Sequence, residues 1–201
     1  LRSSYTILRI ILLTLEAMLM GKTWIAFFSQ TGSEIANISE KLGRRPDLVI
    51  TNSRPEHLRK IDERITSQDY ILHETKNKPE EVNLDRIFQQ YSKDTELIIT
   101  LHGWLRIMPP DICNKYTIYN GHPGLITKYP ELKGKDPQHK VIFGDYDTMG
   151  CVLHGVTAGV DEGKVLSSKE VSRKGLVGKD IFRILGNISQ ELWLDFLNNK
   201  L

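Results

Sequence analysis

The chain has 201 residues, which is enough for one compact domain and leaves little room for two. Hydrophobic residues make up 40% and charged residues 26%, a balance that is typical of globular proteins and argues against wholesale disorder. The 27 basic residues are nearly offset by 25 acidic ones, which disfavours a protein dedicated to coating nucleic acid. The two cysteines, Cys113 and Cys151, cannot build a disulfide framework and fit no zinc spacing, so we expect a reducing, cytoplasmic setting.

The beginning of the chain differs from the rest. Residues 7–20 are mostly apolar, but Arg9 and Glu16 interrupt them, so the apolar run is too short to cross a bilayer and makes a poor secretory signal. The segment is either an amphipathic extra helix or upstream sequence added by an over-long gene assignment, and we favour the second. Residues 1–19 are then a non-native, disordered or helical leader, and residues 20–201 form a single domain.

From residue 24 onward, strand and helix patterns alternate. Apolar runs predict five strands, over residues 24–28, 47–51, 70–73, 96–101 and 117–120. Three amphipathic segments lie between them: one capped by Ser33 and ended by Gly43, one opened by Pro55, and one over residues 81–91. The isoleucine-rich run 96–101 is typical of a central strand buried on both faces.

After Pro130 the pattern changes. It predicts a helix over residues 135–143, strands over 150–157 and 164–171, and a closing amphipathic helix over 180–197. The whole order favours an α/β fold with a mostly parallel central sheet, right-handed crossovers and helices on both faces. Ligands bind such sheets at the carboxyl ends of the strands, which directs attention to Ser29, His102 and Asn120.

The strongest local feature ends the fifth predicted strand, where the chain reads Tyr119-Asn120-Gly121-His122-Pro123-Gly124. Asn120 and His122 are two residues apart, so an extended backbone projects both side chains to the same side. An amide donor beside an imidazole can hold a carbonyl oxygen and stabilise negative charge on it. A polar strand end with a solvated histidine explains the same pattern when it is taken alone.

A carboxylate follows about forty residues later, in Asp161-Glu162-Gly163. If it lies near His122, it would raise the pKa of that histidine and could accept a proton through water. We expect His122 to lie in a surface cleft. Taken alone, the Asp-x-Gly pattern is a turn.

The segment after the central strand offers a possible ligand wall. Gly103 permits close backbone approach, and Trp104 with Met108 could wall a flat apolar ligand. The alternative is a simple strand-to-helix junction capped by Pro109.

These three segments, in this order, resemble the motifs of the 10-formyltetrahydrofolate-dependent formyltransferase family. Residues 102–109 (HGWLRIMP) resemble its folate-binding G-[FWY]-x-R-I-[LM], and residues 120–129 (NGHPGLITKY) resemble its N-x-H-P-S-L-L-P-K-[YF]. Residues 150–157 with 160–163 resemble G-x-[ST]-[LV]-H-x-V…D-x-G. Each motif is weak alone, but the shared order and spacing are specific. Size and a Lys-Tyr-Pro segment are most similar to the single-domain glycinamide ribonucleotide (phosphoribosylglycinamide) formyltransferases.

The resemblance implies a Rossmann-like formyltransferase fold and transfer of a formyl group from 10-formyltetrahydrofolate, a co-substrate, without a metal. The implied acceptor is the primary amine of a small phosphorylated molecule like glycinamide ribonucleotide. The implied catalytic residues are Asn120, His122 and Asp161. The implied folate contacts are Leu105, Arg106, Ile107, Met108, Asn120, Val160 and Asp161, and the implied acceptor contacts are Thr31, Gly32 and Ser33. His154 is expected to be a structural partner rather than a second acid.

The first loop departs from the family pattern. It reads Gln30-Thr31-Gly32-Ser33-Glu34 where the glycinamide enzymes carry G-N-G-S-N, whose backbone amides cradle the substrate phosphate. Gly32 and Ser33 at a helix start can still bind an anion, but Glu34 puts a negative charge where the phosphate would lie. Residues 131–138 depart as well. The folate half is thus kept and the acceptor half is altered, which leaves the acceptor amine open.

Other functions remain as alternatives. A sugar-nucleotide or nucleotide N-formyltransferase would tolerate a rebuilt first loop, and a non-catalytic folate- or nucleotide-binding module would share the fold. A nicotinamide oxidoreductase is disfavoured because no G-x-G-x-x-G follows the first strand. We expect a small-molecule partner, no nucleic acid, no membrane, and a monomer or homodimer.

Overall fold

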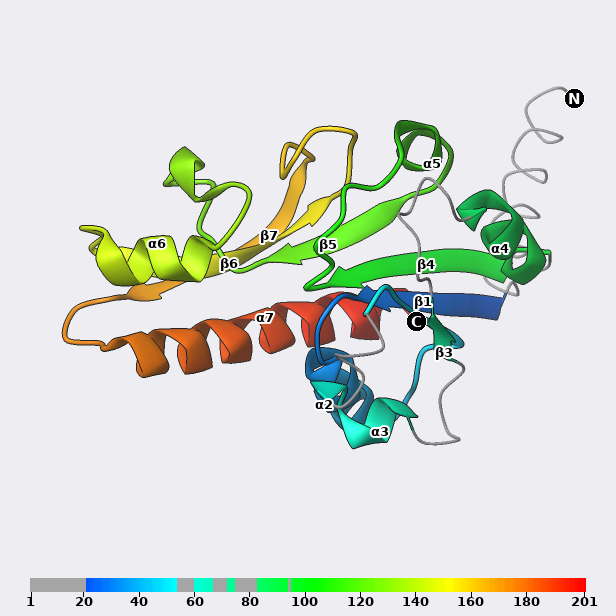
Figure 1. Ribbon diagram of the computed structural model, residues 1–201, viewed down its shortest axis with the longest axis horizontal. Helices are drawn as coiled ribbons and strands as arrows, with labels where there is room; N and C mark the ends of the chain where they lie inside the picture. The colour runs from blue at the N-terminus through cyan, green and yellow to red at the C-terminus, as the bar shows by residue number, and fades with distance from the viewer. Residues whose placement is uncertain (1–20, 54–59, 67–71, 75–82, 94) are drawn as a thin grey trace, which may run out of the picture.

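A computed structural model describes residues 21–53, 60–66, 72–74, 83–93 and 95–201 (Figure 1). Seven strands form one sheet in the order β3-β2-β1-β4-β5-β6-β7. The strands are β1 (Gly21–Phe28), β2 (Leu48–Thr51), β3 (Leu72–Glu74), β4 (Thr95–His102), β5 (Ile118–His122), β6 (Thr148–Gly155) and β7 (Val165–Ser172). The helices are α2 (Ser33–Leu42), α3 (Glu63–Thr66), α4 (Leu84–Tyr91), α5 (Pro110–Lys115), α6 (Pro137–Phe143) and α7 (Gly178–Lys200), with a 3₁₀ turn η3 (Pro130–Leu132).

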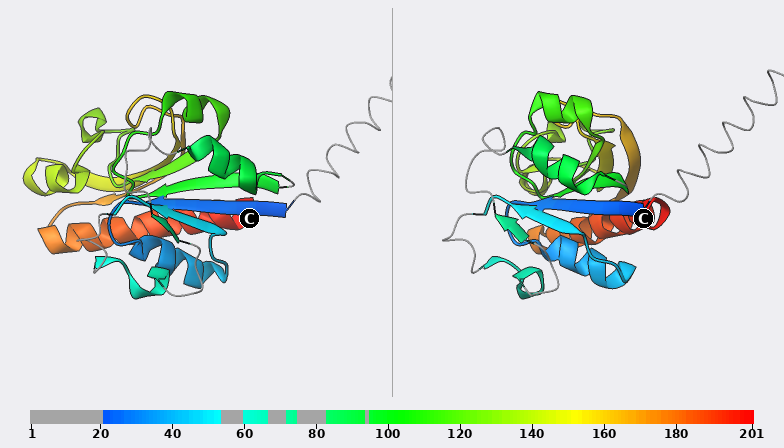
Figure 2. Two further views of the ribbon diagram at one scale, coloured as in Figure 1. Left: turned by 45° about the vertical axis from the view of Figure 1, so that its right-hand side comes forward. Right: turned by 90° about the vertical axis from the view of Figure 1, so that its right-hand side faces the viewer.

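The predicted α/β architecture is confirmed. Strands β1 to β5 are parallel, and helices cover both faces of the sheet: α2, α3 and α7 on one side, α4 and α5 on the other (Figures 1 and 2). The last two strands are antiparallel, β6 to β5 and β7 to β6. Strands β6 and β7 are antiparallel because a single loop, with no crossover, joins these two neighbouring strands.

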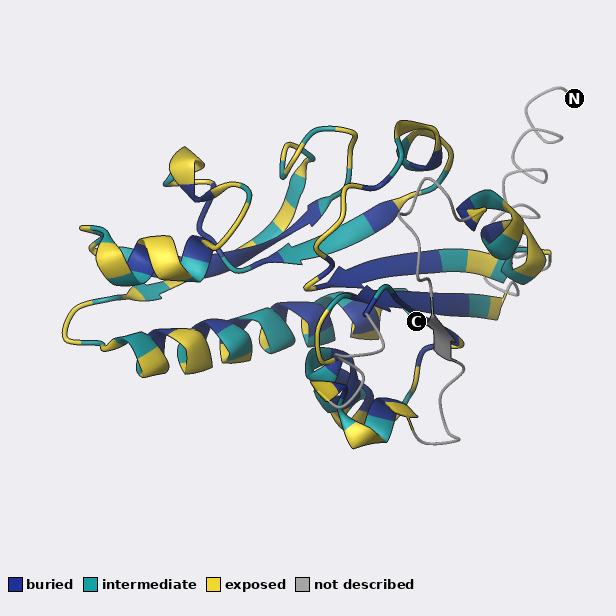
Figure 3. Cartoon of the chain, in the orientation of Figure 1, coloured by how far each residue is buried: buried dark blue, intermediate teal, exposed yellow. Residues whose placement is uncertain are grey.

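The side chains of β1 show how the sheet is buried on both faces. Trp24 and Ala26 face the core shared with α2 and α7, whereas Ile25 and Phe27 face the core shared with α4 and α5. A third core lies between β6, η3, α6 and α7, around Leu132. Successive strand residues point to opposite faces, so a strand between two helical layers is buried on both, as most of β1 is (Figure 3).

Several predicted boundaries move by a few residues. Strand β1 begins at Gly21, because its ladder with β4 already starts there, and the fifth strand extends to His122. Helix α2 is capped by the backbone of Gly32, at φ 71°, and not by the Ser33 side chain, while the predicted end at Gly43 is confirmed. Helix α6, predicted from residue 135, begins at Pro137, whose fixed φ suits a first helical position.

Two predictions fall partly or wholly outside the described residues. The leader over residues 1–19 lies outside them, as does the start of the helix predicted from Pro55, of which the structure describes only α3. The helix predicted over residues 81–91 is described from Leu84, where the side chain of Asn83 caps it. Among the described residues, no helix combines the length and the apolar character that crossing a membrane requires.

Candidate functional site

The carboxyl end of β5 and the facing end of β6 supply the first side chains of the site. Asn120 and His122 both lie on β5, and Asn120 pairs directly with His154 of β6. Directly paired residues of antiparallel strands share a face of the sheet, and here Nδ2 of Asn120 lies 3.1 Å from Nε2 of His154. The pairing of β5 with β6 therefore brings the motif over residues 120–129 next to the motif over residues 150–157.

Asp161 completes the cluster from the loop between β6 and β7. Its Oδ2 atom lies 3.2 Å from Nδ1 of His122. Its Oδ1 atom lies 3.3 Å from Nε2 of His154 and accepts a hydrogen bond from Asn120 Nδ2 at 3.5 Å. The backbone of Asp161 is left-handed, with φ 52°, a conformation that aspartate tolerates better than most residues. The structure thus brings together Asn120, His122 and Asp161, which are far apart in the sequence.

Residues 132–134, at the end of η3 and just after it, hold this cluster through their backbone. The ring of His122 donates from Nε2 to the backbone carbonyl of Leu132, at 2.8 Å, and the backbone N–H of Gly134 donates to Asp161 Oδ2, also at 2.8 Å. His122 is consequently buried, with 5% of its surface exposed, and the expectation of a surface cleft at this histidine is wrong. The overlying segment covers the ring.

Burial and mutual contact set the pKa values of His122 and Asp161. Burial lowers the pKa of His122 below its ordinary 6.5, although the charge of Asp161 and the Leu132 carbonyl act in the opposite direction. The expected effect of the carboxylate is present, because Asp161 raises the pKa of His122, but burial outweighs it and the net shift is downward. Burial alone would raise the pKa of Asp161, but hydrogen bonding with His154 and the charge of His122 hold it below its ordinary 3.8. Asp161 is a carboxylate at neutral pH.

His154 is closer to the site than the sequence suggested. Its Nδ1 donates to the backbone carbonyl of Gly155 at 2.7 Å, which fixes the ring and leaves Nε2 between Asn120 and Asp161. With 2% of its surface exposed, it supports the other side chains from within the sheet. Only the register of β5 against β6, which the sequence does not state, could have revealed this contact. Among the described residues, no group of three or more His, Cys, Asp or Glu is arranged to hold a metal ion.

The predicted folate segment has three exposed residues, 105–107, followed by the buried Met108. Leu105 and Ile107 are 63% and 65% exposed, whereas Met108 is 2% exposed. Trp104 packs edge-on against Phe27 with ring centroids 5.1 Å apart, so Trp104 and Met108 belong to the core and do not wall a ligand as expected. Any contact from Met108 to a ligand is through its backbone.

The remaining predicted folate contacts lie at the surface. Val160 is 48% exposed in the loop that carries Asp161, and Arg106 is exposed between Leu105 and Ile107. The backbone N–H of Leu105 donates a hydrogen bond to the hydroxyl of Ser29, at 2.8 Å, and this bond links the segment to the carboxyl end of β1. Exposed apolar side chains on a loop offer a surface to a flat ligand.

The predicted acceptor residues lie at the start of α2, across β4 from the cluster. The hydroxyls of Thr31 and Ser33 are 2.8 Å apart, and the backbone N–H of Ser33 donates to the Thr31 hydroxyl at 3.3 Å. Gly32 is left-handed, and a Cβ there would lie 3.1 Å from the side chain of Ile65. A contact that the sequence did not suggest follows immediately: the Glu34 carboxylate bonds to a histidine of β4 and a serine of α7.

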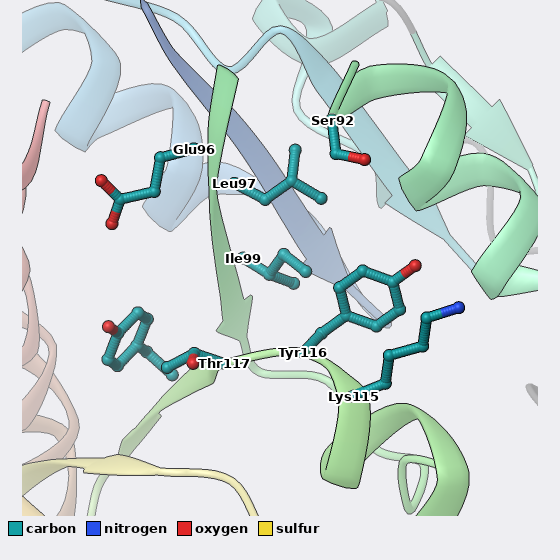
Figure 4. A pocket seen from close by; sticks show the side chains of 8 residues that line it. Ser92, Glu96, Leu97, Ile99, Lys115, Tyr116 and Thr117 are labelled. Carbon is teal, nitrogen blue, oxygen red and sulfur yellow. The ribbon is translucent and has the colours of Figure 1, made fainter. Parts of the chain in front are cut away.

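A separate hollow of about 270 Å³ lies at the opposite end of the sheet (Figure 4). It is lined by Ser92, Glu96, Leu97, Ile99, Lys115, Tyr116, Thr117 and Tyr119, none of which is a predicted site residue. Its two charged side chains are paired, Lys115 with Asp85 and Glu96 with Lys22. We assign no ligand to this hollow.

Comparison with known proteins supplies the family context for this geometry. A family model described as formyl transferase matches residues 23–173, three quarters of the chain. The trifunctional purine biosynthetic protein adenosine-3 of Bos taurus is 28% identical over 93 residues, which are 45% of this chain but only 9% of that much longer protein.

Solved structures share the fold. A phosphoribosylglycinamide formyltransferase from Bacillus halodurans is similar with a TM-score of 0.69 and 21% identity, covering 86% of this chain and 91% of that one. A formyltetrahydrofolate deformylase from Pseudomonas syringae is similar with a TM-score of 0.66 and 17% identity, covering 85% of this chain and 58% of that one.

Proposed function

Because the chain belongs to the formyl transferase family, we propose that it transfers a formyl group from 10-formyltetrahydrofolate to the primary amine of a small acceptor. The protein is thus a formyltransferase, and the donor and acceptor are the proposed parts. The observation that carries the proposal is the bridge made by Asp161, which contacts His122 with one oxygen and Asn120 with the other. A binding module alone requires no such bridge between an imidazole and an amide.

The chemistry follows from the groups that meet. The acceptor amine attacks the formyl carbon and a C–N bond forms, while the formyl oxygen takes up negative charge. The amide of Asn120 is a donor that stabilises this oxyanion, and the imidazole of His122 becomes a second donor when its Nε2–H is released from the Leu132 carbonyl. Asp161 stays ionised, orients the ring of His122 and helps a water molecule remove the amine proton. The bond from the formyl carbon to N10 of the folate then breaks, and N10 takes a proton.

The folate would lie against the two loops that carry exposed apolar side chains. Leu105 and Ile107 come from the loop after β4, and Val160 comes from the loop after β6. The second loop also carries Asp161, so a pterin bound against this loop would lie next to the catalytic cluster. Binding energy from these contacts positions the formyl carbon for attack.

Two classes of acceptor are in view. An acceptor like glycinamide ribonucleotide is supported by the names of the similar structures and of the bovine relative, and would place the reaction in purine biosynthesis. An amino-sugar nucleotide is favoured by one observation, the rebuilt loop at the start of α2, where Glu34 follows Thr31, Gly32 and Ser33. A cytoplasmic setting remains a prediction from the cysteine content.

An acceptor screen tests the proposal. Purified protein is supplied with 10-formyltetrahydrofolate and either glycinamide ribonucleotide or amino-sugar nucleotides, and formylated product and released tetrahydrofolate are quantified together. We expect equal amounts of both with at least one amine. Folate binding without amine-dependent release of tetrahydrofolate from any acceptor would favour the non-catalytic binding module instead.

A further inference from the structure

A chain of hydrogen bonds runs through the buried end of the sheet to the start of α2. The indole N–H of Trp24 donates to the hydroxyl of Thr100 at 2.8 Å, and that hydroxyl lies 2.9 Å from Nε2 of His102. The other ring nitrogen of His102, Nδ1, lies 3.0 Å from Oε2 of Glu34. The hydroxyl of Ser189 on α7 donates to Oε1 of Glu34 at 2.6 Å. The chain therefore ends on a carboxylate that is held at both oxygens.

The donors available fix the direction of each bond. An indole N–H can only donate, so the oxygen of Thr100 accepts there and its own hydrogen is free for Nε2 of His102. A carboxylate oxygen accepts, so Nδ1 of His102 donates to Glu34. Glu34 accepts at both oxygens, and among the residues that the structure describes no lysine or arginine forms an ion pair with it.

The Glu34 carboxylate lies at the position where a parallel α/β fold offers an anion site. Glu34 is in the first turn of α2, which follows the carboxyl end of β1, and the positive end of a helix dipole favours anions there. The chain's own carboxylate supplies the negative charge, and the Thr31 hydroxyl takes the N–H of Ser33. The side chain of Glu34 is 26% exposed, so its field reaches the surface at this edge.

The same hydrogen-bonded chain touches the catalytic strand. His102 of β4 pairs with Gly121 of β5, the residue between Asn120 and His122. The ring of His102 also lies against that of Trp193, with centroids 4.4 Å apart, and the indole nitrogen of Trp193 is 2.6 Å from where a Cβ on Gly121 would stand. Glu34 is thus fixed at the same edge of the sheet as the reacting groups, one strand away.

We propose that Glu34 is a specificity-determining residue that disfavours acceptors carrying a phosphate monoester toward the start of α2 and favours neutral or cationic groups there. The inference rests on the proposed formyl transfer for its acceptor. Its physical basis does not, because two anions within a few ångströms of each other repel at a partly buried site. A fixed carboxylate cannot swing aside to relieve that repulsion, since both of its oxygens are bonded.

A phosphate-binding measurement tests the inference without any turnover. Ribose 5-phosphate is titrated calorimetrically into the wild-type chain, the Glu34→Gln variant and a matched Glu40→Gln control from the far end of the same helix. We expect Glu34→Gln to bind this phosphate at least about tenfold more tightly than wild type, and the control to match wild type. Equal affinity in all three proteins would overturn the inference.

A second variant separates charge from shape. Ser189→Ala removes one anchor of Glu34 but keeps the carboxylate, which His102 still holds, so ribose 5-phosphate should bind this variant clearly more weakly than it binds Glu34→Gln. If Ser189→Ala and Glu34→Gln raise phosphate affinity equally, loosened packing is responsible and the inference fails. Thermal unfolding of each variant verifies that the proteins compared are folded.

Kinetics then connect Glu34 to the acceptor. Glycinamide ribonucleotide is compared with its counterpart that lacks the 5′-phosphate, and the ratio of the two kcat/KM values should shift about tenfold toward the phosphorylated acceptor in Glu34→Gln. An unchanged ratio contradicts the inference. If no acceptor is formylated but Glu34→Gln gains phosphate affinity, the proposed function has failed while the role of Glu34 stands.

Discussion

Nδ1 of His122 and Oδ2 of Asp161 are 3.2 Å apart, although 39 positions of the chain and two different loops separate the residues. Each partner is held by a further backbone group of one segment: His122 by the carbonyl of Leu132 and Asp161 by the N–H of Gly134. The pair is therefore pre-organised before any substrate arrives. Pre-organised groups reduce the reorganisation needed when charge develops in a transition state.

Replacing His122 tests the assignment of the imidazole directly. We expect His122→Ala to lower kcat by about 10²–10³-fold, the usual effect of losing one donor to an oxyanion. Because the ring is buried and bonded to Leu132, the variant should also unfold at a lower temperature. His139→Ala, an exposed histidine on α6, serves as the control and should retain wild-type turnover. Wild-type turnover in His122→Ala would remove the imidazole from the mechanism.

Asp161→Asn tests the coupling between the two groups through pH. The charge of Asp161 raises the pKa of His122 against the effect of burial, so removing it should lower that pKa further. If a neutral His122 is the active form, activity falls as pH decreases through this pKa, and the acid limb of kcat/KM moves to lower pH in the variant. The measurement is a pH profile of both proteins, and an acid limb that stays in place contradicts the coupling.

The stability of the same variant has its own pH dependence. The folded-state pKa of Asp161 lies below its ordinary 3.8, so ionised Asp161 stabilises the fold at all pH values above 3.8. This contribution is lost as pH falls below 3.8 and through the folded-state pKa. The difference in unfolding free energy between wild type and Asp161→Asn should therefore be largest near neutral pH and shrink in acid, as followed by urea denaturation. If this difference in unfolding free energy grows as the pH falls, ionised Asp161 does not stabilise the fold and the prediction is wrong.

Gly121 lies between the two β5 side chains of the site and has no room for a Cβ. A methyl group there would stand 2.6 Å from the indole nitrogen of Trp193. We expect Gly121→Ala to cost about 1–3 kcal/mol of stability, as overpacking does, and to reduce kcat because Asn120 and His122 shift with the strand. The matched change Gly186→Ala, inside α7 with nothing within 4 Å, should instead stabilise the protein by roughly 0.5–1 kcal/mol.

In the loop after β4, the exposed Ile107 is available to a ligand, whereas the neighbouring Met108 is packed in the core. Ile107→Ser removes an exposed apolar group, so we expect a several-fold higher KM for the folate donor with an unchanged unfolding temperature. Met108→Ala, one residue further, should destabilise the fold by about 2–5 kcal/mol because its side chain is buried. A loss of stability in Ile107→Ser without any change in KM would place this side chain in the packing and not at the folate.

The strands and their order along the chain were predictable because most of them are short apolar runs, although β7 carries Ser, Lys and Glu. The direction of β6 and β7 was not read from those runs, since an apolar strand looks alike in a parallel and an antiparallel ladder. The choice of Asn120, His122 and Asp161 rested on motif order. Their mutual contacts depend on the register of β5 against β6 and on the left-handed turn at Asp161, which are tertiary facts.

Burial and long-range partners were the harder part to predict. Trp104 and Met108 are apolar and follow Gly103, a pattern that fits both a ligand wall and a core, and the structure places them in the core. The charge of Glu34 is visible in the sequence, but its bond to Ser189, 155 positions away, is not. Interactions of this kind decide what a loop can bind, and short sequence patterns carry no record of them.

The stacking of Trp193 on His102 gives the protein an internal optical probe. The indole is fully buried, lies against the ring of His102 and touches the backbone of the strand that carries Asn120 and His122. Indole emission is sensitive to neighbouring dipoles and to ring contacts of this type. With Trp24 and Trp104 replaced by phenylalanine, the fluorescence of the remaining tryptophan would follow ligand arrival at this edge of the sheet in real time, with no attached dye.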